Sequence, residues 1–138
     1  MVNIYIAAYK EFGDYKILKK VCDYFLQNLN KDEVLFYAST GESGDNTCMK
    51  YVRDNEYKYI DWIPQKKGKN RSEEKLKVIE NSNHSILVHN GSSVGISIAI
   101  RHCAKNVKGK IVVIYPDKDK LFVYQLGKKI KEKKISEI

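Results

Sequence analysis

Hydrophobic and polar positions near the start of the chain follow two different periods. Val2, Ile4 and Ile6 alternate with other residues, which is the period of a strand. After a turn around residues 12–13, the period becomes that of an amphipathic helix with Asp14 as its N-cap. The apolar positions on one face of this helix are Ile17, Leu18, Val21, Cys22, Phe25, Leu26 and Leu29.

The same order of strand and helix continues to residue 115. Runs rich in β-branched, aromatic and other apolar residues predict further strands at 34–38, 57–63, 85–89 and 110–115. Apolar residues at helical spacing predict helices that lie in 45–55, 70–79 and 96–103. Such alternation predicts an α/β fold, a Rossmann-like three-layer sandwich with a mainly parallel sheet of about five strands.

The pattern changes beyond Pro116. Residues 121–126 predict another strand and Gly127 a turn, whereas 128–138 fit either a strand or a charged helix. We therefore assign 1–116 to the Rossmann-like domain and 117–138 to a C-terminal extension of the same domain. This extension is expected to be an appended strand or hairpin at the sheet edge, or an oligomer contact.

Composition narrows the class of protein. A chain of 138 residues, 43% of them hydrophobic, is long enough to bury one continuous core. Cys22, Cys48 and Cys103 are widely spaced and lack metal-ligand spacing, so we expect buried thiols and no metal. The start of the chain does not resemble a signal peptide, and no apolar run has the length that a bilayer requires. We expect a cytoplasmic protein with no membrane partner.

The formal net charge of +8 is concentrated in two places, 66–71 and 128–134. Lysine also dominates solvated faces, and this chain is rich in lysine throughout. The charge is therefore better explained by solubility than by a polyanion site.

Glycine and serine gather where predicted strands end and helices begin. In open parallel sheets, ligands bind beyond the carboxyl ends of the strands, so the loops 8–13, 39–44 and 90–95 are expected to meet there. Their glycines allow close approach to a ligand, the serines and Thr40 add hydroxyl donors, and the helix starts offer N–H groups to an anion. The predicted ligand-binding residues are Ala8, Tyr9, Phe12, Ser39, Thr40, Gly41, Ser43, Gly44, Asp45, Arg71, Asn90, Gly91, Ser92, Ser93 and Gly95.

For several of these residues, a purely structural role is the alternative to ligand binding. Asp45 is either the helix N-cap or an acceptor for a ribose or base, and Arg71 either clamps a phosphate or begins a helix. Tyr9 and Phe12 either stack on a base or close the core. Glu42 is expected to be solvent-exposed, although a loop carboxylate there could act as a general base. The three histidines are expected to be structural, with His89 the nearest to the site.

Taken together, these segments resemble the SLOG superfamily, specifically its small YspA-like and YpsA-like branches. The segment 40–45 resembles the family's glycine-rich segment and retains Gly44 and Asp45, without the alanine between them. Asn70 and Arg71 stand in reversed order where the family has an Arg-Asn pair. The segment 90–95 resembles a later Asn-Gly segment that ends in glycine, and the resemblance covers residues 2–115.

The resemblance implies binding of nucleotides or nucleotide-derived ligands, including NAD-related and ADP-ribose-like signals. Related LOG-type phosphoribohydrolases and nucleoside deoxyribosyltransferases depend on a glutamate in or just after the later glycine segment. This chain has no acid between Asn90 and Asn106. The departure argues against hydrolysis of an N-glycosidic bond at that segment.

Three functions follow as hypotheses. The first is a sensor or sequestering sink for a nucleotide-derived or cyclic nucleotide signal, such as a defence signal, without a cofactor. The second is a nucleoside or nucleotide N-glycosidase or deoxyribosyltransferase-like enzyme, with Glu42 or Asp45 as its acid or nucleophile. The third, nucleic-acid binding, is disfavoured because the sequence shows no basic stripe interleaved with aromatics. A homo-oligomer is expected, since related proteins commonly pair.

Overall fold

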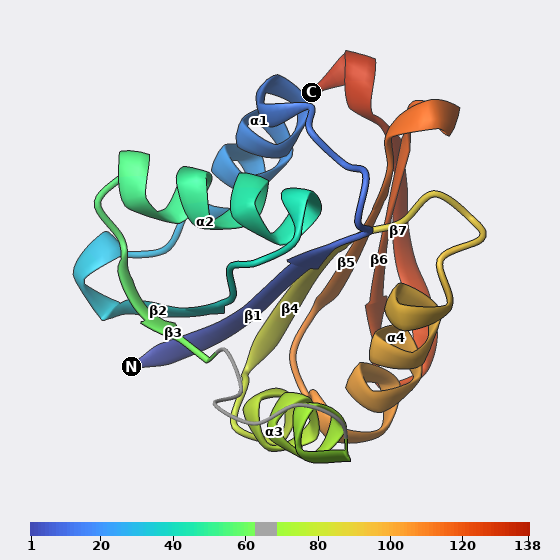
Figure 1. Cartoon of the computed structure of the whole chain (residues 1–138). Coiled ribbons are helices and arrows are strands. Elements are labelled where there is room, and N and C mark those ends of the chain that lie inside the picture. Colours follow the sequence, from blue (N-terminus) through green and yellow to red (C-terminus); the bar gives the residue numbers. More distant parts are fainter. Residues whose placement is uncertain (63–68) are drawn as a thin grey trace.

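The computed structural model describes the backbone of residues 1–62 and 69–138 and the side chains of 1–62 and 73–138 (Figure 1). Its strands and α-helices are β1 (Val2–Ala8), α1 (Tyr15–Leu26), β2 (Val34–Ala38), α2 (Ser43–Asp54), β3 (Lys58–Asp61), α3 (Lys69–Glu80), β4 (His84–Val88), α4 (Val94–Asn106), β5 (Ile111–Tyr115), β6 (Lys120–Gln125) and β7 (Lys128–Lys134). Short 3-10 helices span Lys31–Glu33, Pro116–Lys118 and Ile135–Glu137.

The strands form one sheet in the order β3-β2-β1-β4-β5-β6-β7. Neighbours from β3 through β5 are parallel, whereas β6 and β7 are antiparallel additions. The predicted α/β class is confirmed. The sheet is larger than the predicted five parallel strands, because the C-terminal extension, predicted as an appended strand or hairpin, continues it as the hairpin β6–β7 to seven strands. The chain crosses from β3 at one edge to β4 beside β1, so the order reverses between β1 and β4.

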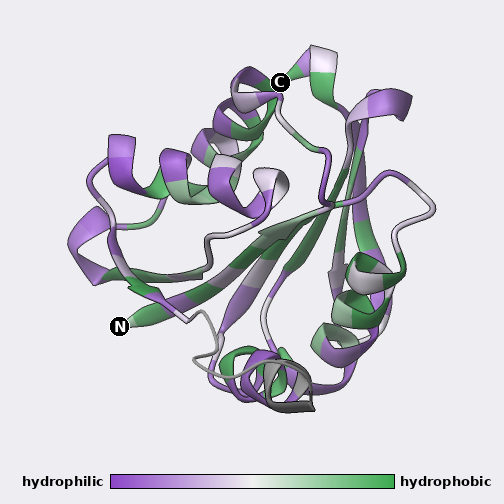
Figure 2. Ribbon diagram, in the orientation of Figure 1, coloured by the Kyte–Doolittle hydropathy of each residue, from purple (hydrophilic) through white to green (hydrophobic). Residues whose placement is uncertain are grey.

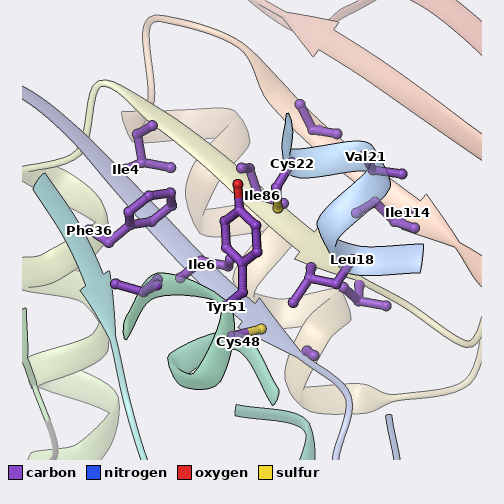
Figure 3. Close-up of a cluster of buried hydrophobic side chains, with 14 of the residues drawn as sticks. Ile4, Ile6, Leu18, Val21, Cys22, Phe36, Cys48, Tyr51, Ile86 and Ile114 are labelled. Carbon is purple, nitrogen blue, oxygen red and sulfur yellow. The ribbon is translucent and has the colours of Figure 1, made fainter. Parts of the chain in front are cut away.

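Helices cover both faces of the sheet. α1 and α2 lie on one face, and α3 and α4 lie on the other (Figure 1). In Figure 2 the hydrophobic stripes of the helices turn toward the sheet, as amphipathic packing requires. The larger core lies under α1 and α2, where Leu18, Val21 and Tyr51 pack against Ile6 and Ile86 (Figure 3). The second core lies under α3 and α4.

Local sequence signals place several elements as predicted. Asp14 caps α1, and its carboxylate accepts a hydrogen bond of 3.2 Å from the Ile17 N–H. The predicted buried face of α4 is confirmed at Ile96, Ala99 and Cys103. The three cysteines are buried and form no disulfide, in agreement with the expected buried thiols. The basic loop predicted at 65–69 falls mostly outside the described residues.

The C-terminal segment forms a strand where the sequence left strand or helix open. β7 carries five lysines along the edge of the sheet, and charged edge strands resist pairing with another chain. Ile135 turns back into the larger core and anchors the end of the hairpin. Throughout the described part of the chain, no helix is both long and apolar enough to cross a membrane.

Candidate ligand-binding pocket at the carboxyl ends of β1 and β4

A pocket of about 280 Å³ opens where the strand order reverses. The end of β1, the loop after β2, the end of β3, α3 and the first turn of α4 all contribute to it. Its lining consists of Tyr5, Ala7, Ala8, Tyr9, Lys10, Glu42, Asp45, Trp62, Lys75, Ser93, Gly95 and Ile96. This position is where open α/β sheets bind their ligands.

The loop after β1 contributes one aromatic wall. The Tyr9 N–H donates to the Val88 carbonyl oxygen at 3.1 Å, which ties this loop to β4. Tyr9 is half-buried and lines the pocket, whereas Phe12 is 1% exposed and packs edge-on against Tyr9. Of the two aromatics predicted to reach a ligand, Tyr9 is therefore placed to do so and Phe12 closes the core.

The start of α2 is occupied by protein backbone. The Gly44 N–H donates to the Lys10 carbonyl oxygen at 2.9 Å. A Cβ at position 44 would collide with the carbonyl oxygen of Tyr9, so only glycine fits where α2 meets this loop. Gly44 thus serves helix packing, and its N–H is not free to bind a phosphate.

Thr40, Gly41 and Ser43 bond to other groups of the protein and lie outside the pocket lining. Gly41 has a φ of +114°, and its N–H donates to the Asn46 side-chain oxygen at 3.1 Å. The Thr40 hydroxyl donates to the Asp61 carboxylate at 3.2 Å. Ser43 is exposed at the first position of α2, where its carbonyl oxygen accepts from the Thr47 hydroxyl. These residues shape the turn between β2 and α2.

Asp45 joins two strand ends through its carboxylate. One oxygen accepts from the Ala8 N–H at 3.3 Å and the other from the Ser39 hydroxyl at 3.0 Å. The prediction that Asp45 is the N-cap is wrong, because α2 begins at Ser43 and Glu42 is its N-cap. Burial raises the pKa of Asp45, against the lowering effect of its two hydrogen bonds, and the negative charge of Glu42 raises it further.

Glu42 is the second carboxylate of the pocket. It is half-buried and lines the pocket, so the expected solvent exposure is only partial. Its side chain makes no cap hydrogen bond with any described residue of α2. The carboxylate is therefore available to the pocket.

The start of α4 is arranged differently from the start of α2. The Asn90 side-chain oxygen accepts from the N–H groups of Ser92 and Ser93 at 2.9 and 2.8 Å, and Gly91 takes a φ of +92° in this turn. The Ser93 hydroxyl caps the helix by accepting from the Ile96 N–H at 3.3 Å. Ser93 and Gly95 line the pocket, whereas Asn90, Gly91 and Ser92 hold the turn behind it.

Gly95 presents backbone to open space. It is exposed in the first turn of α4, and a Cβ at this position would meet nothing within 4 Å. N–H groups in the first turn of a helix have no partner within the helix and lie at the positive end of its dipole. The first turn of α4 therefore offers the pocket an anion-binding end.

Six lining residues were not predicted as binding residues from the sequence: Tyr5, Ala7, Lys10, Trp62, Lys75 and Ile96. Three of these add charge or an indole to the pocket. Lys10 and Lys75 bring positive charge from the loop after β1 and from α3, and Trp62 brings an indole from the end of β3. The Trp62 side-chain N–H is buried without a hydrogen-bond partner among the described residues. Position near the end of a predicted strand was an available signal for Trp62, but nothing local marked Lys75. Arg71 lies in α3, and its side chain is outside the described residues.

His89 supports the loop that leads to α4. Its Nδ1 accepts from the Gly91 N–H at 3.2 Å, which leaves the proton on Nε2 to be donated to the Ser97 hydroxyl at 3.1 Å. Burial lowers the pKa of His89, and the nearby Lys118 lowers it further. His84 is structural in the same way, since its Nδ1 accepts from the Lys110 N–H at 2.8 Å.

No protein-family model matches the chain, and no curated protein matches it either. The resemblance to the SLOG superfamily therefore stays a prediction. Within the parts of the chain that the structure describes, no three or more His, Cys, Asp or Glu residues gather to hold a metal ion.

Proposed function

We propose that the pocket between β1 and β4 binds a nucleotide-derived, phosphate-bearing ligand, and that the protein acts as a sensor or sequestering sink for it. The observation that carries this proposal is the meeting of a helix N-terminus, two lysines and two aromatic side chains in one pocket. These groups match the phosphate and the base of a nucleotide. The resemblance to the SLOG superfamily supports the same ligand class.

The anionic part of the ligand belongs at the start of α4. Gly95 allows a phosphate to approach the backbone, and Ser93 stands beside it at the N-cap. Lys10 and Lys75 add positive charge to the pocket. Their attraction to a phosphate is screened as the ionic strength rises. We expect affinity for the ligand to weaken as salt rises.

The base and the sugar belong to the other walls. Tyr9 is half-buried and offers a ring on which a base can stack, since stacking needs an accessible aromatic face. Trp62 is 9% exposed and closes the pocket with a largely buried indole. Glu42 and Asp45 offer carboxylate oxygens to ribose hydroxyl donors. At about 280 Å³ the pocket lies just below the usual range of ligand sites, roughly 300–1,000 Å³, which favours one nucleotide unit inside it.

Calorimetric titration tests the proposal. The purified protein is titrated with ADP-ribose, NAD, nucleoside monophosphates, and cyclic and linear signalling nucleotides, and each ligand is then recovered and chromatographed. Saturable binding of an intact ligand is the expected result. The absence of binding by every member of the panel would contradict the proposal.

A pair of lysine variants locates the site. Lys75→Gln removes a charge from the pocket, whereas Lys77→Gln removes one from the solvated side of the same helix, where Lys77 lies 3.7 Å from Glu74. We expect Lys75→Gln to weaken binding about ten-fold and Lys77→Gln to change it less than two-fold, because exposed pairs contribute little. Equal losses in the two variants would move the site elsewhere.

The two carboxylates support a second function, cleavage or transfer at an N-glycosidic bond. Glu42 and Asp45 line the same pocket, and the raised pKa of Asp45 is typical of a catalytic acid. Recovery of free base in place of intact ligand would establish turnover. Glu42→Gln and Asp45→Asn would then show which carboxylate the reaction needs.

A further inference from the structure

The outer strands of the sheet carry a second set of aromatic and basic side chains. Residues directly opposite on neighbouring strands lie on the same face of a sheet. The register of β5, β6 and β7 therefore gives one face three rows, Tyr115–Lys120–Lys134, Val113–Phe122–Glu132 and Ile111–Tyr124–Lys129. This surface is called the outer sheet face below.

The opposite side of these strands is already covered. Leu121 and Val123 belong to the core under α1, and the Lys131 ammonium donates to the Tyr24 hydroxyl of α1 at 2.9 Å. On the outer sheet face, α4 reaches β5 and the near side of β6. A groove of about 310 Å³ there is lined by Ile100 and Ala104 of α4 together with Tyr115 and Tyr124.

The aromatic rings of this face form a continuous row. His89 stacks on Tyr115 with ring centres 5.5 Å apart and 27° between planes. Tyr115 meets Phe122 edge-on at 5.5 Å, and Phe122 lies 6.3 Å from Tyr124. Phe122 and the two tyrosines are half-buried, so part of each ring is open to solvent. The row thus crosses from the end of β4 to β6.

Lysines border the row on its solvent side. The Lys118 ammonium lies 5.3 Å from the Tyr115 ring centre, and Lys129 lies 5.3 Å from that of Phe122. Lys120 and Lys134 add two more charges in the row of Tyr115. Among the described residues of these rows, Glu132 is the one acid, and it lies 2.9 Å from Lys129 and 3.7 Å from Lys120. The three rows therefore carry three lysines against one glutamate, which is a net positive charge.

We propose that the outer sheet face binds single-stranded nucleic acid, at a site separate from the pocket between β1 and β4. Bases that are unpaired can stack on the half-open rings, while exposed lysines move to the phosphates. Tyr115 and Tyr124 line the groove beside α4, and bases that are paired and stacked in a duplex do not present free faces to such rings. A second copy of the chain is a poor occupant, because a two-fold contact through this face would set its lysines against the same lysines.

The sequence hid this arrangement because its members lie on different strands. Tyr115 comes from β5, Phe122 from β6 and Lys129 from β7, and only the antiparallel register brings them together. A linear search for lysines interleaved with aromatics therefore finds no stripe.

Fluorescence anisotropy with a labelled twelve-residue oligothymidylate tests the proposal. The variants are Phe122→Ala and Lys129→Gln on the outer sheet face, with Lys131→Gln as the matched control. Lys131 lies on the same strand and carries the same charge, but it faces α1 and contacts Tyr24. Circular dichroism melts check whether each variant is folded.

We expect the wild-type protein to bind the oligonucleotide more weakly as salt rises. Phe122→Ala and Lys129→Gln each weaken binding about five- to ten-fold, and Lys131→Gln weakens it less than two-fold. Equal losses in Lys129→Gln and Lys131→Gln would overturn the proposal in favour of non-specific charge. An absence of binding would also overturn it, and a dimer abolished by Phe122→Ala in size-exclusion chromatography would assign the face to a second copy. We expect these variants to leave the binding of mononucleotides in the pocket unchanged. The proposal for the outer sheet face and the proposal for the pocket can therefore be contradicted independently.

Discussion

The two glycine- and serine-containing loops that precede α2 and α4 differ in what their glycines contact. In the first turn of α2, Gly44 lies against the backbone of the loop after β1 and donates its N–H to the Lys10 carbonyl oxygen. In the first turn of α4, Gly95 lies against open space in the wall of the pocket. Two segments of similar composition therefore have different roles. The segment at α2 allows close packing of the helix, and the segment at α4 leaves the helix N-terminus accessible to a ligand.

The difference arises from where each helix starts relative to β1. The loop after β1 runs beneath the start of α2, because the Gly44 N–H reaches the Lys10 carbonyl oxygen at 2.9 Å. In the turn before α4, the Asn90 side-chain oxygen accepts hydrogen bonds from the N–H groups of Ser92 and Ser93. The first turn of that helix therefore faces the pocket. A glycine-rich loop thus predicts close approach of backbone, but not whether the approaching group is protein or ligand.

The largest expected effect is a contrast between alanines at the two glycines. Gly44→Ala forces a Cβ into the Tyr9 carbonyl, so we expect a loss of about 3 kcal/mol in the free energy of unfolding. Gly95→Ala adds a Cβ in open space within a helix, so it is expected to change stability by less than about 1 kcal/mol. Urea denaturation of the two variants measures both values. Equal losses would show that the two helix starts are packed alike.

Removal of the Asp45 side chain should have the next largest effect. Asp45→Ala leaves the Ala8 N–H without its acceptor in a half-buried place, and we expect it to cost about 2 kcal/mol. Asp45→Asn keeps one acceptor oxygen and can donate to Ser39, so its loss should be less than half as large. Thermal unfolding of the pair checks the ratio. If both cost the same, the carboxylate contributes by charge and not by hydrogen bonding.

The caps of the two helices provide a smaller contrast. Ser93→Ala removes the hydroxyl that accepts from Ile96, and losing such a cap costs about 1 kcal/mol. Glu42→Ala removes a side chain that makes no cap hydrogen bond with the described residues of α2, so its effect should lie within about 0.5 kcal/mol. Chemical denaturation of both variants at neutral pH measures the difference. A larger loss for Glu42→Ala would reverse the assignment of caps.

The smallest effects on the free energy of unfolding are expected from pH. They have opposite signs for His89, which follows β4, and Asp45, which lies in α2. The pKa of His89 is lowered in the folded protein, so its stabilising contribution is present above the unfolded pKa of about 6.5 and is lost as pH falls through the folded pKa. The pKa of Asp45 is raised, so its contribution is present below the unfolded pKa of about 3.9 and is lost as pH rises through the folded pKa.

Stability curves of His89→Gln and Asp45→Asn against the wild-type protein between pH 4 and 7 separate the two contributions. Relative to His89→Gln, the wild-type protein should lose stability as the pH falls. Relative to Asp45→Asn, it should gain stability over the same range. Parallel curves for all three proteins would show that neither side chain titrates differently on folding.

The sequence predicted the elements better than their contacts. Helical periodicity and the Asp14 cap located α1, and the spacing of Ile96, Ala99 and Cys103 located α4, because these are local properties of the chain. The hairpin β6–β7 was only half predicted, since the lysine-rich segment from 128 fits an exposed strand as well as a charged helix.

The pocket was predicted in part for a different reason. Its position followed from the general rule for parallel sheets, and Tyr9, Ser93 and Gly95 were named correctly as lining residues. Lys75 and Trp62 were missed because they reach the pocket from α3 and β3, and only the strand order brings those elements to β1. Gly44 was assigned to a ligand because its clash partner, the Tyr9 carbonyl, lies 35 residues earlier in the chain.

Calorimetric titration of wild-type, Gly95→Ala and Gly95→Asp proteins with the same panel of nucleotides tests the anion site at α4 most directly. An aspartate in the first turn of α4 fits the open space and favours the helix dipole, so the variant stays folded with equal or higher stability. Its charge repels a phosphate at the same place. We expect binding by the wild-type protein, a modest change in Gly95→Ala and a loss of affinity of more than ten-fold in Gly95→Asp. Affinity unchanged in Gly95→Asp, or no binding by the wild-type protein, would contradict it.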